Sequence, residues 1–104
     1  MPIYKDEMLK VLWKFKMGTG IVVKMKNEGL ITGFMIDIYN DDNGLDFGTE
    51  GYEEYDSCVI YVTKLSRDHN GEIYQPGQLT EINCKMPVEQ IQLFDGTVIW
   101  KAED

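Results

Sequence analysis

Few residues in this chain could do covalent chemistry. The single histidine, His69, is the side chain best suited to act as a general base near neutral pH, but it lies in the predicted hairpin turn RDHNG, where we expect it to be exposed. Cys58 would begin a strand directly after an acidic segment, which disfavours the nucleophilic thiolate. The sequence contains neither a phosphate-binding glycine loop nor a nucleophile elbow, and a carboxylate pair such as Glu53 and Glu54 leaves no sequence signature. We therefore predict a non-catalytic protein without a cofactor.

Clustered carboxylates could instead bind a hard cation. If Gly44 is taken as the invariant glycine of a calcium loop, three oxygen ligands, Asp41, Asn43 and Glu50, fall at the third, fifth and twelfth positions. The first position is Tyr39, which lacks a carboxylate, and the flanking residues resemble strands and loop where the motif needs helices. We predict a solvated loop without a metal, with those three residues as weak candidates.

Charge is unevenly distributed along the 104 residues, whose formal net charge is −8. Residues 1–26 contain six lysines and two acids, a charge of +4 (6 − 2), so the remainder carries −12 (−8 − 4). Residues 37–56 contain no base and eight acids: Asp37, Asp41, Asp42, Asp46, Glu50, Glu53, Glu54 and Asp56. Such a field repels nucleic-acid phosphates and favours basic protein surfaces, so we expect a protein partner and no general nucleic-acid binding.

Aromatic residues are interleaved with these acids, and tyrosine offers both apolar area and a hydrogen-bonding tip at interfaces. They could equally cover the core of the domain. The interface hypothesis assigns partner binding to Tyr39, Asp42, Asp46, Phe47, Glu50, Tyr52, Glu53, Glu54, Tyr55 and Asp56. The segment would then dock a basic protein partner. The alternatives are an acidic decoy that imitates nucleic acid, as small phage and mobile-element proteins do, or a protein that sequesters a small ligand.

The N-terminal segment, residues 1–17, fits a short helix slightly better than a strand. Met8, Leu12 and Phe15 have helical spacing, whereas the alternating apolar residues from Val11 to Met17 would suit a strand. Strands are clearer in IVVKMK, where alternate residues are apolar, and in LITGFMIDIY, whose interior Gly33 suggests a bulge or bend. Residues 40–57 then form a long acidic loop or an irregular hairpin.

Strand character resumes in SCVIYVTKL and again in LTEINCKM. We expect the following PVEQ to form one helical turn before the strand IQLF, and Asp95-Gly96 to make a hairpin into TVIWK. The whole chain, residues 1–104, is thus predicted to be a single, mainly β domain.

This order of elements resembles the small SH3-like and Sm-like barrels. Residues 20–40, GIVVKMKNEGLITGFMIDIYN, look like the first Sm motif, with Gly29, Gly33, Asp37 and Asn40. The resemblance implies a five- to six-stranded barrel whose edge strands join into rings, so we expect a homo-oligomer, with TVIW as a candidate edge. The Asp-Asn spacing is shorter than in that family, and CKMPVEQI replaces the Arg-Gly of the second motif. The uridine binding of Sm proteins is therefore not carried over.

Cysteine usage and the N-terminus indicate the compartment. No signal-like or membrane-spanning apolar stretch occurs in the sequence, so we predict a cytoplasmic protein. Cys58 and Cys84 are expected to be buried thiols, although a disulfide is possible if their strands pair.

Overall fold

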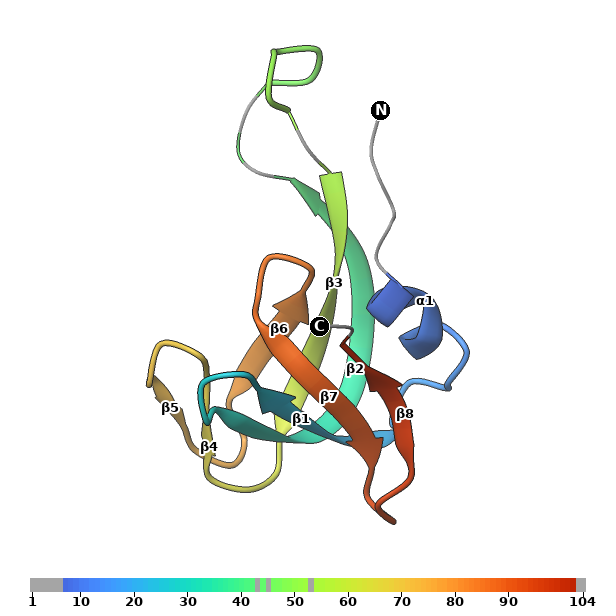
Figure 1. Ribbon diagram of the computed structural model, residues 1–104, viewed down its shortest axis with the longest axis vertical. Coiled ribbons are helices and arrows are strands. Elements are labelled where there is room, and N and C mark those ends of the chain that lie inside the picture. The colour runs from blue at the N-terminus through green and yellow to red at the C-terminus, as the bar shows by residue number, and fades with distance from the viewer. Residues whose placement is uncertain (1–6, 43, 45, 53, 103–104) are drawn as a thin grey trace.

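A computed structural model describes residues 7–42, 44, 46–52 and 54–102 of the chain. The fold is mainly β, as predicted, and consists of one antiparallel sheet with a single short helix (Figure 1). The elements are α1 (Glu7–Leu12), β1 (Gly20–Met25), β2 (Leu30–Asp42), β3 (Glu54–Val62), β4 (Ser66–Arg67), β5 (Ile73–Tyr74), β6 (Leu79–Asn83), β7 (Val88–Leu93) and β8 (Val98–Lys101). Within these residues, no helix is both long and apolar enough to cross a membrane.

The sheet is built around the long strand β2, which pairs with three strands. Residues 30–34 of β2 pair with β1, which continues through β7 to β8, and residues 33–42 pair with β3, which continues to β6. Leu30 also pairs with β4, which continues to β5. Strands β6 and β8 each have one strand neighbour, so the sheet is not closed and the predicted closed barrel is wrong. Two branches of the sheet thus start from β2, one through β3 to β6 and the other through β1 and β7 to β8. Helix α1 packs against β3 of the first branch and β8 of the second. The helix therefore covers core residues that pairing between the two branches would otherwise enclose.

Strand β2 has two separate irregularities. At Gly33 the backbone of β3 lies so close that a Cβ would overlap the backbone oxygen of Tyr61. The bulge itself comes later, between Met35 and Asp37, which pair with consecutive residues of β3. The sequence therefore indicated a distortion in this strand, and the structure separates the close approach from the bulge.

The core follows the alternation of the strands. Ile21, Val23 and Met25 are buried on one face of β1, as the pattern predicted. Helix α1 adds its apolar stripe to the same core, which contains Met8, Leu9, Leu12, Ile31, Met35, Ile38, Cys58, Ile60, Ile82, Val88 and Ile91. The helical interpretation of the N-terminal segment is thus confirmed for Glu7–Leu12, whereas Phe15 lies beyond the end of the helix and residues 1–6 lie outside the described residues.

Three expectations about local structure are wrong. PVEQ does not form a helical turn, because Val88 already begins β7 and fills the core, while Lys26 N donates a hydrogen bond to Pro87 O. Cys84 is exposed in the turn after β6, whereas Cys58 is buried as expected, and the structure has both as thiols. The turn RDHNG lies between two short additional strands, β4 and β5, so the sheet has more strands than the five or six expected.

Candidate functional site

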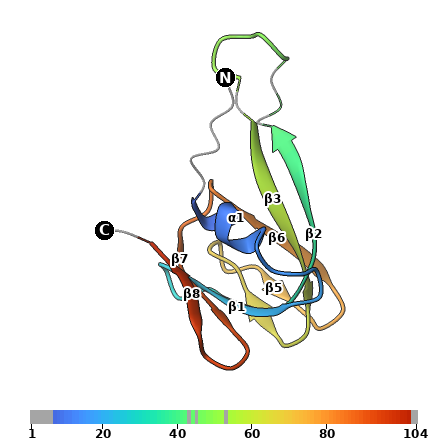
Figure 2. The same cartoon turned by 90° about the vertical axis from the view of Figure 1, so that its right-hand side faces the viewer.

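The acidic segment forms most of a projecting hairpin, which we call the acidic hairpin (residues 37–56). Strands β2 and β3 remain paired as far as Asp42 opposite Glu54. Of the two alternatives for residues 40–57, the hairpin is therefore confirmed, and the long loop is wrong for the residues that extend both strands. Figures 1 and 2 show this hairpin extending beyond the other strands along the longest axis, whose extent is 42 Å against 28 and 26 Å for the others. The acidic segment is therefore displayed at one end of the molecule.

The tip of the hairpin (residues 46–52) places an aromatic pair among carboxylates. Phe47 is 84% exposed, and its ring and the ring of Tyr52 form an edge-to-face pair with 5.5 Å between centroids. The Tyr52 hydroxyl donates a hydrogen bond of 2.8 Å to Glu54 Oε2. Asp46 and Glu50 are exposed in the same turn, where Thr49 N donates to Asp46 O. The tip can therefore offer an apolar ring and negative charge together.

Two predicted anchors farther down the hairpin are engaged by neighbouring strands. The Tyr39 hydroxyl donates to both carboxylate oxygens of Glu81, at 3.1 and 2.9 Å. The ammonium of Lys85 lies 5.6 Å from the centroid of the Tyr55 ring, a cation–π distance. These contacts connect β2 and β3 to β6 and to the turn after it, so both tyrosines help to hold the hairpin.

Helix α1 is connected to the acidic hairpin through Asp56. Trp13 directly follows the helix and donates from Nε1 to Asp56 Oδ2 at 3.4 Å, although its side chain is 56% exposed. Deeper in the same strand, burial raises the pKa of Cys58 to about 12, and the charge of Asp37 acts in the same direction. This thiol is unsuited to act as a nucleophile at neutral pH.

The structure does not bring together a metal site from the residues it describes. None of its His, Cys, Asp and Glu side chains form a group of three that could hold an ion. Asn43 and Glu53 lie outside the described residues, as do the side chains of Asp41 and Asp42, so these candidates stay predictions.

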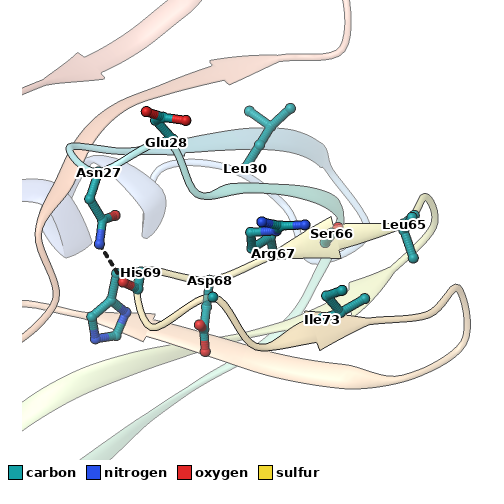
Figure 3. A pocket seen from close by; sticks show the side chains of 10 residues that line it. Asn27, Glu28, Leu30, Leu65, Ser66, Arg67, Asp68, His69 and Ile73 are labelled. Carbon is teal, nitrogen blue, oxygen red and sulfur yellow. Dashed lines mark hydrogen bonds between the residues drawn. The ribbon is translucent and has the colours of Figure 1, made fainter.

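A cavity of about 330 Å³ lies away from the acidic hairpin, between the β1–β2 turn and the β4–β5 hairpin (Figure 3). His69 lines it, and its backbone oxygen accepts a hydrogen bond from the Asn27 side chain. Its Nδ1 is buried without a hydrogen-bond partner among the described residues. His69 is therefore half-buried, and the expected exposure in a free turn is wrong.

Sequence reasoning did not identify this cavity, nor the contacts that hold the hairpin. The cavity is lined by Leu30, Leu65, Arg67 and Ile73, which are brought together by pairing of β2 with β4 and of β4 with β5. The sequence contains one local indication of the cavity, the apolar Leu65, which stands between polar residues shortly before the turn RDHNG.

Comparison with known proteins gives one match. A family model described as "Cognate immunity protein YxxD" matches residues 3–104, which is nearly the whole chain. The search of curated proteins and the search of solved structures found no match.

Proposed function

We propose a toxin-binding role for this chain, which belongs to the family of cognate immunity proteins YxxD. Membership supports a non-enzymatic protein that binds a partner protein. Beyond that, we propose that the acidic hairpin is the part that docks, and that it meets a basic surface of the toxin in the cytoplasm of the producing cell.

The observation that carries this proposal is the exposed ring of Phe47 among carboxylates at the tip of a projecting hairpin. Aromatic side chains in desolvated pockets supply much of the energy of many interfaces, so an exposed phenyl ring is suited to anchor a partner. Asp46 and Glu50 flank the ring in the chain and would attract a basic surface.

The contacts of the stem, the paired parts of β2 and β3 below the tip, support the same role by reducing the conformational entropy lost on binding. Trp13 holds one strand of the hairpin through Asp56, and Glu81 holds the other through Tyr39. A hairpin that is already ordered loses less conformational freedom when it docks. Mutation of these stem residues would therefore weaken binding indirectly.

The test is the affinity of the purified chain for its toxin, measured by calorimetry. We expect Phe47→Ala to weaken binding by about 2 kcal/mol, a factor of about 30. The matched control is Val98→Ala on β8, which removes another exposed apolar side chain (49% exposed) and should leave affinity unchanged. Equal affinities for the Phe47→Ala variant and the unmodified chain would exclude the tip as the anchor.

The second candidate function is imitation of nucleic acid, which the alternation of carboxylates with a stackable ring at the tip favours. In that case the hairpin would occupy a nucleic-acid-binding cleft of the toxin. Duplex or single-stranded RNA should then displace the chain from the toxin, whereas docking elsewhere would leave the complex intact. Competition measured at constant salt distinguishes the two.

A further inference from the structure

The cavity beside β4 has apolar walls that the fold leaves exposed. Leu30, Leu65 and Ile73 line it and are 44%, 65% and 48% exposed. Figure 3 shows their side chains around the strand that carries Ser66 and Arg67. Burial of such surface is favourable, so the cavity has apolar area available for a ligand or partner.

The same cavity contains a cation, Arg67, without an ion-pair partner among the described residues. Arg67 makes no ion pair or hydrogen bond through its side chain within the described part of the chain, and Glu28, which also lines the cavity, is not within ion-pair distance of it. The neighbouring carboxylate of Asp68 is already used, since it accepts hydrogen bonds from Asn70 N at 2.8 Å, Glu72 N at 3.0 Å and the Tyr74 hydroxyl at 3.3 Å.

An occupant of this cavity should therefore combine an apolar group with a negative charge. The acidic tip of the chain itself has this chemistry, because exposed Phe47 is adjacent to exposed Asp46. We propose that the cavity binds the acidic tip of a second copy of this chain. In this contact the Phe47 ring packs among Leu30, Leu65 and Ile73, and Asp46 pairs with Arg67, whose guanidinium can also contact the ring.

The charges of the two regions can meet favourably at one point. Among the residues that line the cavity, Arg67 carries a positive charge and Glu28 and Asp68 carry negative charges, so the attraction for an acidic tip is local to Arg67. The acidic hairpin carries −8 from its eight acids. Pairing of Asp46 with Arg67 would bring opposite charges together, whereas contact between two acidic hairpins would bring only like charges together.

The arrangement of the fold makes this contact intermolecular. Figures 1 and 2 place the acidic tip beyond the upper ends of β2 and β3, and β4 and β5 toward the other end of the molecule. The contact would join different surfaces of the two copies, so it is heterologous, and each dimer would retain one unused tip and one unused cavity. Association should therefore continue with concentration, into a ring or a short chain.

Self-association would also regulate access to the tip. This regulation rests on the proposed function, whereas the self-association does not. A tip held in the cavity of another copy cannot dock on the toxin. Toxin binding should then dissociate the assemblies.

Sedimentation velocity of the full chain from about 1 to about 200 µM tests the contact. We expect the sedimentation coefficient of the unmodified chain to rise with concentration. A tip variant (Asp46→Asn with Phe47→Ala) and a cavity variant (Leu65→Ala with Arg67→Glu) should each stay monomeric. Mixing them should restore a heterodimer, because one supplies an intact cavity and the other an intact tip. The control variant combines Glu89→Gln on β7 with Val98→Ala on β8, where both side chains are exposed. It should associate like the unmodified chain.

Any of three results would overturn the proposal: a monomer throughout this range, association of either variant like that of the unmodified chain, or no heterodimer in the mixture. If the cavity variant proved unstable, Leu65→Ala alone should weaken association by about tenfold. A monomeric unmodified chain whose cavity variant lost toxin affinity would assign the cavity to the toxin instead. Loss of toxin binding in the Phe47→Ala variant, by contrast, tests only the proposed function.

Discussion

Cys58 and Cys84 are two thiols of the same chain with opposite environments. Cys58 is fully buried in β3, and burial together with the charge of Asp37 raises its pKa to about 12. Cys84 is exposed. Because the thiolate is the reactive form, we expect one thiol per chain to react with an aromatic disulfide reagent at pH 8, and the second only after unfolding. Rapid reaction of both thiols in the folded chain would contradict the burial of Cys58.

The same group makes stability depend on pH in alkaline solution. The pKa of Cys58 is raised from 9.0 to about 12 on folding, so above pH 9 the unfolded chain loses a proton that the folded chain keeps. The stabilisation is therefore fully present below pH 9 and is lost as the pH rises toward 12, by about 1.4 kcal/mol per unit. Urea unfolding at pH 8 to 10.5 should show little change below pH 9 and approach this slope above it, and the Cys58→Ala variant, in which the thiol is missing, should show a smaller slope.

Single residues show where sequence reasoning succeeded and where it stopped. The alternating pattern identified Ile21 and Val23 as core residues, because side-chain direction along a strand is a local property. The engagement of Tyr39 by Glu81 and of Tyr55 by Lys85 depends on the pairing of β3 with β6, which brings together residues far apart in the chain. No local pattern could predict which aromatic residue of the segment stays exposed.

At the scale of elements, the pairing of β2 with β3 depends on Gly33. A methyl group at this position would overlap the Tyr61 backbone oxygen and approach Ile60 Cγ2 to 2.7 Å, so one of the two strands must shift. We expect Gly33→Ala to lower the free energy of unfolding by about 1–3 kcal/mol, as overpacking does. Chemical denaturation measures this change.

Gly20 is the matched control for this substitution. It also lies in a paired strand, but the group that a methyl would meet there is the exposed ring of Phe94. A side chain at the surface can rotate away, whereas a paired backbone cannot, so Gly20→Ala should cost clearly less than Gly33→Ala. Equal costs would show that the backbone contact of Gly33 is not the limiting one.

The tip of the acidic hairpin should be separable from the fold. Strands β2 and β3 are paired up to Asp42 and Glu54, and the buried residues nearest the tip are Ser57, Ile38 and Cys58 in the stem. Replacing residues 43–53 by Asn-Gly, which favours a two-residue hairpin turn, should therefore preserve the fold. We expect a native circular dichroism spectrum and cooperative unfolding, together with loss of toxin binding. Retained binding would assign the toxin to another surface.

Most strands were predictable because each has its own alternation or turn signal. The exceptions have physical reasons. The ends of β2 and β3 are acidic and were expected in a long loop or an irregular hairpin, and they form a hairpin that is stabilised by pairing of the two strands and by Trp13, which directly follows α1. PVEQ follows a proline and contains good helix formers, yet pairing with β1 and burial of Val88 overrode that local preference.

For the whole molecule, closure of the sheet was the property that sequence could not predict. A barrel and an open sheet have the same strands in the same order and differ in whether the last edges meet. Here α1 packs between β3 and β8, which belong to the two branches. The resemblance to Sm-like proteins stays a prediction, and its ring assembly is replaced in our proposal by contact of the acidic tip with the cavity.

The polarity of the whole molecule also leads to a prediction about rates. The hairpin contains eight acids and no base, so its charge of −8 equals the net charge of the whole chain, and a basic toxin should be steered toward that end. Asp46→Asn with Glu50→Gln should lower the association rate several-fold at low salt, reduce its salt dependence and leave the dissociation rate nearly unchanged.

Phe47→Ala should instead raise the dissociation rate and leave the association rate nearly unchanged, because its ring contributes short-range contacts. Stopped-flow kinetics of both variants, with Glu72→Gln and Glu89→Gln as a control for lost charge elsewhere, separates the two effects. If the control lowered the association rate as much as the tip variant, the charge of the whole chain would be steering the encounter, and the hairpin would have no special part in it.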